Sequence, residues 1–337
     1  MSIKAGVLIA HCAKLLEKSG VPSEKAELTA RAIVASDVWG NASHGVMRLP
    51  FYLKRIESGG VNPEAELRIV TARGAIVGMD GEDGLGHWQL WEAAALGVQK
   101  AKEFGISLVS VKNSSHSGAL GVYLYPALDA GQISLVFTNG PAVMPAVGGN
   151  EPLLSTSPIA AGIPAKPPII IDLATSAVAR GKIAAAAKSG GSIPEGWAVD
   201  REGNPITDAK AALQGMLAPL GGAKGFALGL MVEALSAGLS GGPLSTQVKD
   251  MYNAADDASP QSISHTVITI DPNDLGDSAS YEDFAKMSAQ IEASGGRVPG
   301  AKRRHPNTIS EVELTISPAV LSDLDTWSDK FGLARLS

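Results

Sequence analysis

Cysteine is almost absent from this sequence. Its 337 residues include one cysteine, Cys12, which can form neither an intrachain disulfide bond nor a metal site built from several cysteines. No two histidines stand at a spacing typical of metal ligands, so we expect no bound metal. A single thiol fits a reducing compartment, and we expect the protein to be cytoplasmic.

Charged and aromatic residues are also scarce. The charged fraction is 18% and the net charge is -6, so the chain has no basic field that would attract nucleic acid. The longest apolar run, residues 226–239, is interrupted by polar residues and glycines, and we expect no membrane span. Glycine, in contrast, is abundant at 38 residues, which suits an α/β enzyme whose ligand lies against the main chain.

Hydrophobic periodicity predicts an α/β protein that begins with helices. Residues 2–58 are expected to be helical, with a last helix from Pro50 to Ser58 closed by Gly59. A βαβ-like core is then expected from a strand at 106–113, a helix at 116–130 and a strand at 133–139. The other expected elements are strands within 67–80, at 168–172 and at 265–272, helices at 87–103, 177–188, 225–239 and 281–296, and a closing strand and helix within 313–333.

Two common nucleotide-binding motifs are missing. No G-x-G-x-x-G follows a predicted strand and no G-x-x-x-x-G-K-[ST] occurs, so the usual dinucleotide fingerprint is absent. A G-x-S-x-G match at residues 238–242 places Ser240 at the end of an apolar helix. Because a hydrolase nucleophile needs a strand-to-helix elbow, we interpret this match as a coincidence.

The segment NASHGVMRLPFYL, residues 41–53, contains the strongest candidate site. His44 and Arg48 would face the same way in a helical turn, so one substrate could meet a proton-transferring imidazole and a carboxylate-binding guanidinium. Ser43 precedes His44, but neighbouring side chains diverge, so this pair does not indicate a serine hydrolase. The alternative is that Arg48 pairs with a surface acid while His44 caps the turn.

Two further candidates follow predicted strands. His116 opens a predicted helix, where free backbone N–H groups attract a phosphate, although the segment could equally be a helix cap supplied by Ser114, Ser115 or Ser117. Asp172 ends an apolar strand, where α/β proteins commonly bind ligands, although an aspartate there is often a helix cap.

Two basic segments are candidates for phosphate contacts. Lys224-Gly225 is expected at the start of the apolar helix, where an ammonium group could approach a phosphate. The loop RVPGAKRRHP, residues 297–306, carries four cations. The alternative for each segment is a solvated turn or loop.

Taken together, these segments resemble the malate/L-lactate dehydrogenase type-2 family of NAD(P)-dependent oxidoreductases. This family includes ureidoglycolate dehydrogenase, diketogulonate reductase, sulfolactate dehydrogenase and the Δ1-piperideine-2-carboxylate and Δ1-pyrroline-2-carboxylate reductases. The resemblance covers nearly the whole chain and rests on motifs in the family's order: SHGVMRLPFYL, NSSHSGALG, LLSTSPIAAGIP, IIIDLATSAVARG, GGAKGFALGLMVE and RVPGAKRR.

The resemblance implies a non-Rossmann α/β fold whose mixed sheet binds the cofactor. It implies an NAD(P)-binding domain over residues 116–289, and a helical substrate and dimerisation domain formed by residues 1–115 and 290–337. The active sites of the implied homodimer would lie between domains. A fold of this kind would explain why the dinucleotide fingerprint is missing.

The resemblance also implies roles for individual residues. His44 would donate the proton, with Ser43 as its hydrogen-bonded helper, Arg48 as the carboxylate anchor and Thr156 in contact with the substrate. His116 would lie beside the nicotinamide or assist proton transfer. The residues expected to hold the dinucleotide are His116, Ser117, Gly118, Ala119, Leu120, Asp172, Leu173, Ala174, Lys224, Gly225, Arg297, Arg303 and Arg304. Arg303 and Arg304 slightly favour NADPH over NADH, because arginines can hold a 2′-phosphate.

The chain departs from the family pattern at three places. Ser155-Thr156-Ser157-Pro158 replaces the common G-T-N-P. Lys182, in Arg180-Gly181-Lys182, replaces an aspartate of several members and cannot support the catalytic histidine as that aspartate would. His116-Ser117-Gly118 differs from the H-F-G or H-W of hydroxy-acid dehydrogenases. This difference slightly favours a similarity to the imino-acid reductases.

We therefore expect an NAD(P)H-dependent oxidoreductase that acts on a small 2-oxo acid or a cyclic 2-imino acid. One alternative is a dehydrogenase of malate, lactate, ureidoglycolate or a sugar-derived acid. A hydrolase that uses Ser43 or Ser240 is an alternative from another class. The last alternative is a relative that binds the dinucleotide without turnover.

Overall fold

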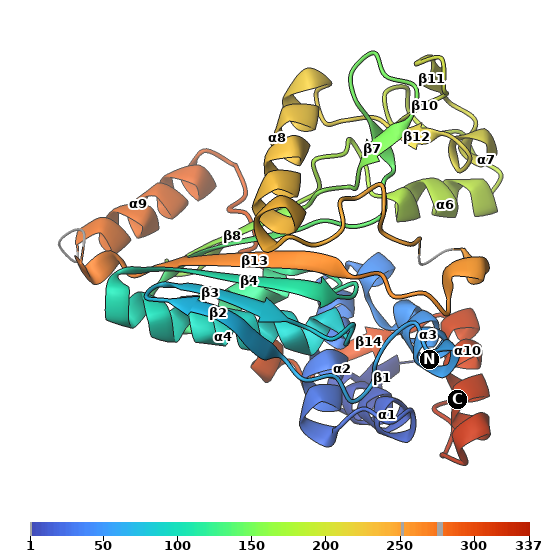
Figure 1. Cartoon of the computed structure of the whole chain (residues 1–337), viewed down its shortest axis with the longest axis horizontal. Coiled ribbons are helices and arrows are strands. Elements are labelled where there is room, and N and C mark those ends of the chain that lie inside the picture. Colours follow the sequence, from blue (N-terminus) through green and yellow to red (C-terminus); the bar gives the residue numbers. More distant parts are fainter. Residues whose placement is uncertain (1, 251–252, 275–278) are drawn as a thin grey trace.

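A central mixed sheet organises the computed structural model, which describes residues 2–250, 253–274 and 279–337 (Figure 1). In the described part of the chain, seven strands form this sheet in the order β2-β3-β4-β13-β5-β8-β9. They are β2 (Arg68–Arg73), β3 (Ile76–Asp80), β4 (Ile106–Ser114), β5 (Ile133–Thr138), β8 (Ile159–Ile163), β9 (Ile169–Leu173) and β13 (Ile263–Ile270). Neighbouring strands are antiparallel except β3 and β4, which are parallel. The predicted mixed sheet is confirmed.

The predicted βαβ-like core is present, but its two strands are not neighbours in the sheet. β13 lies between β4 and β5 and is antiparallel to both, with His265 opposite Val111 on one side and Thr138 on the other, so β4 and β5 are parallel to each other. The parallel pair of neighbouring strands is β3 and β4, which are joined by helix α4 (Gly86–Phe104). The local pattern could not reveal this arrangement, because β13 comes from more than a hundred residues further along the chain.

Helices cover both faces of the sheet (Figure 1). On one face, α4 packs against β4 and β13, beside the 3₁₀-helix η3 (Leu120–Leu124) and helix α5 (Tyr125–Asp129). On the other face, α8 (Ala223–Glu233) continues into a π-helical turn (Ala234–Gly238) that packs on β13. Because both faces are covered, six of the eight residues of β13 are buried, whichever face they point to.

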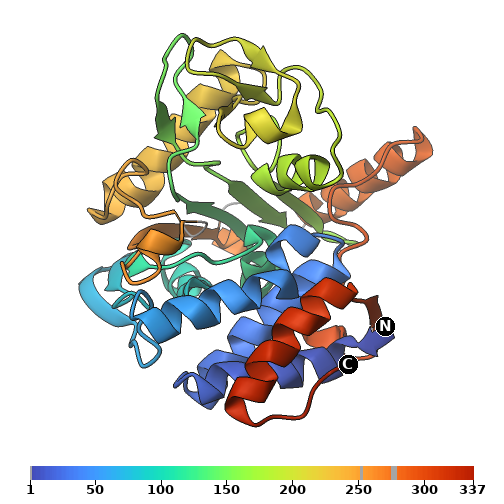
Figure 2. The same ribbon diagram turned by 90° about the vertical axis from the view of Figure 1, so that its right-hand side faces the viewer.

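The two ends of the chain meet in a helical unit. Strand β1 (Ser2–Lys4) pairs with β14 (Glu313–Thr315), and α10 (Pro318–Phe331) packs on α1 (Ala5–Lys18) and α3 (Leu49–Ser58). Helix α2 (Ser23–Val38) joins this unit to α4. Figure 2 shows the N- and C-terminal segments side by side.

A smaller lobe above the sheet has its own apolar core (Figures 1 and 2). It contains α6 (Arg180–Lys188), α7 (Ala209–Ala212) and short strands β10 (Ala198–Val199), β11 (Pro205–Ile206) and β12 (Met216–Leu217). Strands β6 (Met144–Pro145) and β7 (Pro152–Leu154) pair within the preceding loop. Helix α9 (Ala279–Ala293) extends away from one end of the sheet (Figure 1).

Two predicted helices begin later than expected. The helix expected from residue 116 starts at Leu120, because Gly118 has a positive φ of 70° that ends any helical path through the preceding residues. The helix expected from residue 177 starts at Arg180. Residues 41–48, which we call the SHG segment, precede α3, and this helix ends as predicted, with Gly59 left-handed at φ 85°. Among the described residues, no helix is long and apolar enough to cross a membrane.

Candidate active site

The SHG segment forms two short turns between α2 and α3. Ser43 and His44 lie in η1 (Ala42–His44), and Arg48 lies in η2 (Val46–Arg48). The extended backbone of Gly45, at φ -89° and ψ -157°, separates the two turns. The prediction that His44 and Arg48 share one helical turn is therefore wrong.

The half-buried side chain of Asp37 holds this break in the chain. The backbone N–H of Val46 donates to Oδ2 of Asp37 at 2.7 Å, and a methyl group at Gly45 would lie 2.1 Å from Oδ1 of the same carboxylate. Only glycine lets the chain approach Asp37 so closely. Burial raises the pKa of Asp37 to about 7. The turn that carries His44 is thus fixed to the end of α2.

Ser43 and His44 contact each other although they are neighbours in the chain. The Oγ atom of Ser43 lies 3.0 Å from Nδ1 of His44, so the expectation that these side chains diverge is wrong. Arg48, which is 6% exposed, donates from Nε to the carbonyl of Ser43 at 2.7 Å. The 3₁₀ geometry thereby gathers a hydroxyl, an imidazole and a guanidinium within six residues.

Three effects set the charge of His44. Burial lowers its pKa most, the positive charge of Arg48 lowers it further, and the negative charge of Asp172 raises it. The net direction is downward from 6.5, so the neutral ring predominates at neutral pH. Arg48 and Asp172 therefore act in opposite directions on the same imidazole.

His116 lies beside His44 in an irregular segment between β4 and η3. The two imidazole rings are nearly parallel, at 18°, with centroids 5.9 Å apart. Nδ1 of His116 lies 2.7 Å from the hydroxyl of Tyr52 and 3.3 Å from the backbone nitrogen of Gly118, whose N–H donates to it. His116 precedes η3 instead of opening it, and none of Ser114, Ser115 and Ser117 caps this helix through its side chain.

Sequence reasoning missed two aromatic side chains of this cluster. Tyr52 lies in α3 one turn after Arg48, and its ring meets that of His87 edge-on at 4.9 Å. His87 is fully buried in α4, and neither ring nitrogen has a hydrogen-bond partner among the described residues. Burial lowers its pKa to about 3, so the ring is neutral. The four-residue spacing from Arg48 could have drawn attention to Tyr52.

Asp172 is a bridging residue at the end of β9. Its Oδ2 accepts the backbone N–H of Gly121 at 3.1 Å and pairs with Arg303 at 3.1 Å. It is not a helix cap, because α6 begins eight residues later. The Arg303 guanidinium also lies over the ring of Trp39, 5.0 Å from its centroid. Asp172 thus connects the sheet, η3 and the loop at residues 297–306.

Thr156 and Gly225 both lie against the backbone of Thr175, which follows β9. The carbonyl of Thr156 accepts the backbone N–H of Thr175 at 2.9 Å, and the N–H of Leu220 donates to the carbonyl of Thr175 at 2.8 Å. A methyl group at Gly225 would lie 2.8 Å from that same carbonyl, so this glycine lets α8 start against it. Lys224 is exposed in the first turn of α8, as predicted.

Comparison with known proteins identifies the family. The malate/L-lactate dehydrogenase family model matches residues 3–324. The chain belongs to this family. The NADP(+)-dependent (2R)-3-sulfolactate dehydrogenase of Chromohalobacter salexigens is 37% identical over 315 residues, which cover 93% of this chain and 94% of that protein. The Δ1-pyrroline-2-carboxylate reductase of Ancylobacter novellus is 34% identical, covering 92% of each chain.

The fold agrees with this membership. The sulfolactate dehydrogenase structure from Methanocaldococcus jannaschii superposes with a TM-score of 0.88 and 31% identity, covering 99% of this chain and 98% of that one. The sequence resemblance is thereby confirmed, and the chain is an oxidoreductase of the malate/L-lactate dehydrogenase family. The hydrolase alternative is not supported.

Three basic residues considered in the sequence analysis are exposed. Arg297 and Arg304 are exposed on the loop before η7 (Pro306–Thr308), and Lys182 is exposed on α6. Gly181 nevertheless approaches the cluster, since a methyl group there would lie 3.2 Å from Cβ of Ser43. Ser240 donates to Ser264 Oγ at 2.8 Å at the end of the π-helical turn, so it is not at an elbow.

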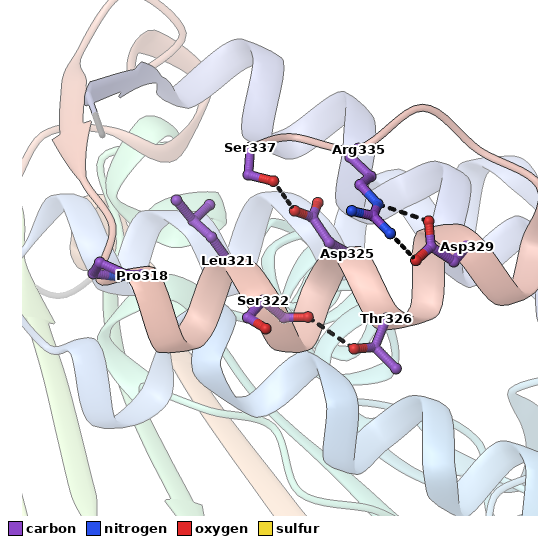
Figure 3. Close-up of a pocket in the computed structure, with 8 residues that line it drawn as sticks. All are labelled: Pro318, Leu321, Ser322, Asp325, Thr326, Asp329, Arg335 and Ser337. Atoms are coloured by element: carbon purple, nitrogen blue, oxygen red, sulfur yellow. Dashed lines mark hydrogen bonds and ion pairs between the residues drawn. The ribbon is translucent and has the colours of Figure 1, made fainter.

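A pocket near the C-terminal residues is unrelated to this cluster. It lies between α10 and the last residues of the chain, where Arg335 forms two hydrogen bonds with Asp329 at 2.8 and 2.6 Å (Figure 3). Ser337 donates to Asp325 in the same place. These polar groups are already paired with each other, so the pocket offers little to a charged ligand.

Proposed function

We propose that this chain is an NAD(P)-dependent oxidoreductase that reduces a small 2-oxo acid or a cyclic 2-imino acid, or oxidises the corresponding product. The observation that carries this proposal is the cluster of Ser43, His44, Arg48 and His116, in which an imidazole able to take up and release a proton adjoins a buried guanidinium. The family membership independently supports oxidoreduction.

Arg48, His44 and Ser43 each have a separate role in such a reaction. Arg48 binds the substrate carboxylate through its guanidinium and so places the adjacent carbon. His44 gives a proton to the oxygen or nitrogen on that carbon, and Ser43 orients its ring through Nδ1. When bound, the nicotinamide supplies the hydride in reduction and accepts it in oxidation.

The chain offers a suitable surface for a dinucleotide. Gly118 is left-handed and carries no side chain, so the backbone of residues 117–120 can approach a ligand closely. Lys224 and Arg304 are exposed cations that suit phosphate groups. Asp172, Leu173 and Ala174 at the end of β9 complete this surface, with Arg303 held by Asp172. We favour NADPH slightly because of the paired arginines, and the named cofactor of one relative is NADP(+).

A second candidate is a dehydrogenase of a 2-hydroxy acid with a further acidic group. The named substrates of several relatives are sulfolactate and malate, which carry a second anion. The sequence at Ser117 favours an imino acid, whereas the names of these relatives favour a hydroxy acid with a second anion. One substrate panel distinguishes the two. We also expect a homodimer, which sedimentation of the purified protein would check.

The test is absorbance at 340 nm with purified protein, NADPH or NADH, and a substrate panel. The panel contains pyruvate, oxaloacetate, 3-sulfopyruvate, diketogulonate, the oxo form of ureidoglycolate, Δ1-pyrroline-2-carboxylate and Δ1-piperideine-2-carboxylate. Turnover of a member supports the proposal and identifies the substrate class and cofactor. The proposal is contradicted if no substrate is turned over with either cofactor, in either direction, at high enzyme concentration.

A further inference from the structure

The site contains a tyrosine, Tyr52, whose hydroxyl lies 2.7 Å from a ring nitrogen of His116. We propose that Tyr52 is a positioning residue that holds His116 in the tautomer with its hydrogen on Nε2. His116 then offers the site an N–H donor, and the proton of the reaction passes through His44 alone. The catalytic part of this inference rests on the proposed function, whereas the tautomer does not.

The two contacts at Nδ1 of His116 determine which atom carries the hydrogen. The backbone nitrogen of Gly118 can only donate, and its N–H points at Nδ1 from 3.3 Å. Nδ1 must therefore present its lone pair, so the Tyr52 hydroxyl at 2.7 Å also donates to it. A neutral imidazole has one N–H, which is then on Nε2, at the far side of the ring from Tyr52.

The surrounding packing keeps Tyr52 in this position. The residue is 2% exposed, and its ring meets His87 edge-on at 4.9 Å with an interplanar angle of 75°. The same His87 lies against Gly118, because a methyl group there would lie 3.1 Å from its Nε2. His87 thus supports both groups that donate to Nδ1, and neither can turn away without opening a fully buried contact.

The charges around His116 keep its ring neutral. Burial lowers its pKa well below 6.5, and the positive charges that His44, Arg48, His87 and His265 can carry lower it further. A ring that stays neutral is a poor proton donor in this reaction. It is a suitable hydrogen-bond donor to an oxygen of the substrate or of the bound cofactor's amide.

The decisive measurement is the tautomer of His116 in the ligand-free protein. Histidine labelled with ¹⁵N gives separate Nδ1 and Nε2 signals for each tautomer, and His116→Gln identifies the signals of this residue among the chain's 6 histidines. In the wild type at pH 8 we expect an unprotonated Nδ1 and a protonated Nε2. A hydrogen on Nδ1 in the wild type overturns the proposal without any variant at position 52.

The variant Tyr52→Phe removes the hydroxyl and keeps the ring. We expect its His116 signals to move towards a tautomer mixture, because only the weaker Gly118 donor remains. Tyr125→Phe is the matched control, since Tyr125 is similarly buried but donates to the carbonyl of Arg303 and not to a histidine. Unchanged His116 signals in Tyr52→Phe, or an equal shift in Tyr125→Phe, overturn the proposal.

Kinetics then test the catalytic part. We expect Tyr52→Phe to lower kcat roughly tenfold to a hundredfold, with a much smaller change in the KM of the substrate. A lost tautomer preference with unchanged kcat overturns the donor role of His116. If the wild type turns over no substrate of the panel, the proposed function fails, whereas the NMR result still decides the tautomer.

Discussion

Ser43 Oγ lies 3.0 Å from Nδ1 of His44, and this contact occupies the ring nitrogen nearest the main chain. In the proposed reaction, proton exchange with a substrate is therefore left to Nε2. Arg48 binds the carbonyl of the same serine, so the proposed carboxylate anchor and the proposed proton donor are held by one residue. Four substitutions test this site and its cofactor surface, and a fifth tests the carboxylate that holds its turn.

Replacing His44 with asparagine should abolish turnover and leave dinucleotide binding nearly intact. Loss of a general acid typically costs a factor of about 10² to 10⁴ in rate, and the side chain is not among those expected to hold the cofactor. Steady-state kinetics and NADPH fluorescence titration measure the two effects. His11→Asn is the control, because His11 contacts Ser328 in α10, away from this cluster. Equal loss of turnover and binding would make His44 a structural residue.

Replacing Asp172 with asparagine should shift the pH profile of reduction to lower pH. Reduction needs protonated His44, so its rate falls as pH rises through the pKa of His44, which lies below 6.5. The negative charge of Asp172 raises that pKa, and asparagine removes the charge while it can still accept the N–H of Gly121. The profile of kcat/KM against pH measures the shift. An unchanged profile, or the same shift in Asp283→Asn on α9, would exclude this coupling.

Replacing Arg48 with lysine should raise the KM of the carboxylate substrate. Lysine keeps the charge but cannot form a two-point contact with a carboxylate while it also binds the carbonyl of Ser43. We expect kcat/KM to fall roughly tenfold to a hundredfold, mainly through KM. Arg31→Lys, in the exposed pair with Glu27 on α2, is the matched control. An unchanged KM would remove Arg48 from the substrate site.

Sequence reasoning located this site better than it described its geometry. Residues 43–48 and Asp172 could be recognised because their types and their places beside predicted elements limit their chemistry. The contact between Ser43 and His44 could not, since it depends on a 3₁₀ turn and on the extended backbone at Gly45. The position of His116 was mistaken because the left-handed conformation of Gly118 is not visible in a helical pattern. The strand at β13 could be predicted, but its place between β4 and β5 could not, because strand pairing over long separations leaves no local signal.

Replacing Arg304 with alanine should weaken NADPH binding and spare NADH binding. The side chain is exposed, so its loss should change the free energy of unfolding by less than about 0.5 kcal/mol. A contact with the 2′-phosphate would be lost only for NADPH, and we expect its Kd to rise roughly tenfold. Titrations of both cofactors, with Arg201→Ala on an exposed turn as control, measure the ratio. Equal weakening of both would place Arg304 elsewhere on the dinucleotide.

Replacing Asp37 with asparagine should make the protein relatively more stable as pH rises. The pKa of Asp37 is about 7 in the folded chain and 3.8 as an ordinary value, so the folded state holds a proton that the unfolded state releases between pH 4 and 7. Wild-type stability therefore contains a contribution that is complete below pH 4 and lost as pH rises through 7. Asparagine has no such contribution and keeps an acceptor for the N–H of Val46.

The measurement is urea unfolding of both proteins from pH 4.5 to 8.5. The free energy of unfolding of Asp37→Asn, relative to the wild type, should increase by on the order of a few kcal/mol across this range. Asp329→Asn is the control and should show no slope over this range, because Arg335 holds the pKa of Asp329 below 3.8 and its carboxylate is charged in both the folded and the unfolded state above pH 4.5. If Asp37→Asn shows no increase relative to this control, Asp37 is ionised throughout this range. The turn at His44 would then be held by a charged carboxylate, and the N–H of Val46 would bind it more strongly than a neutral acceptor.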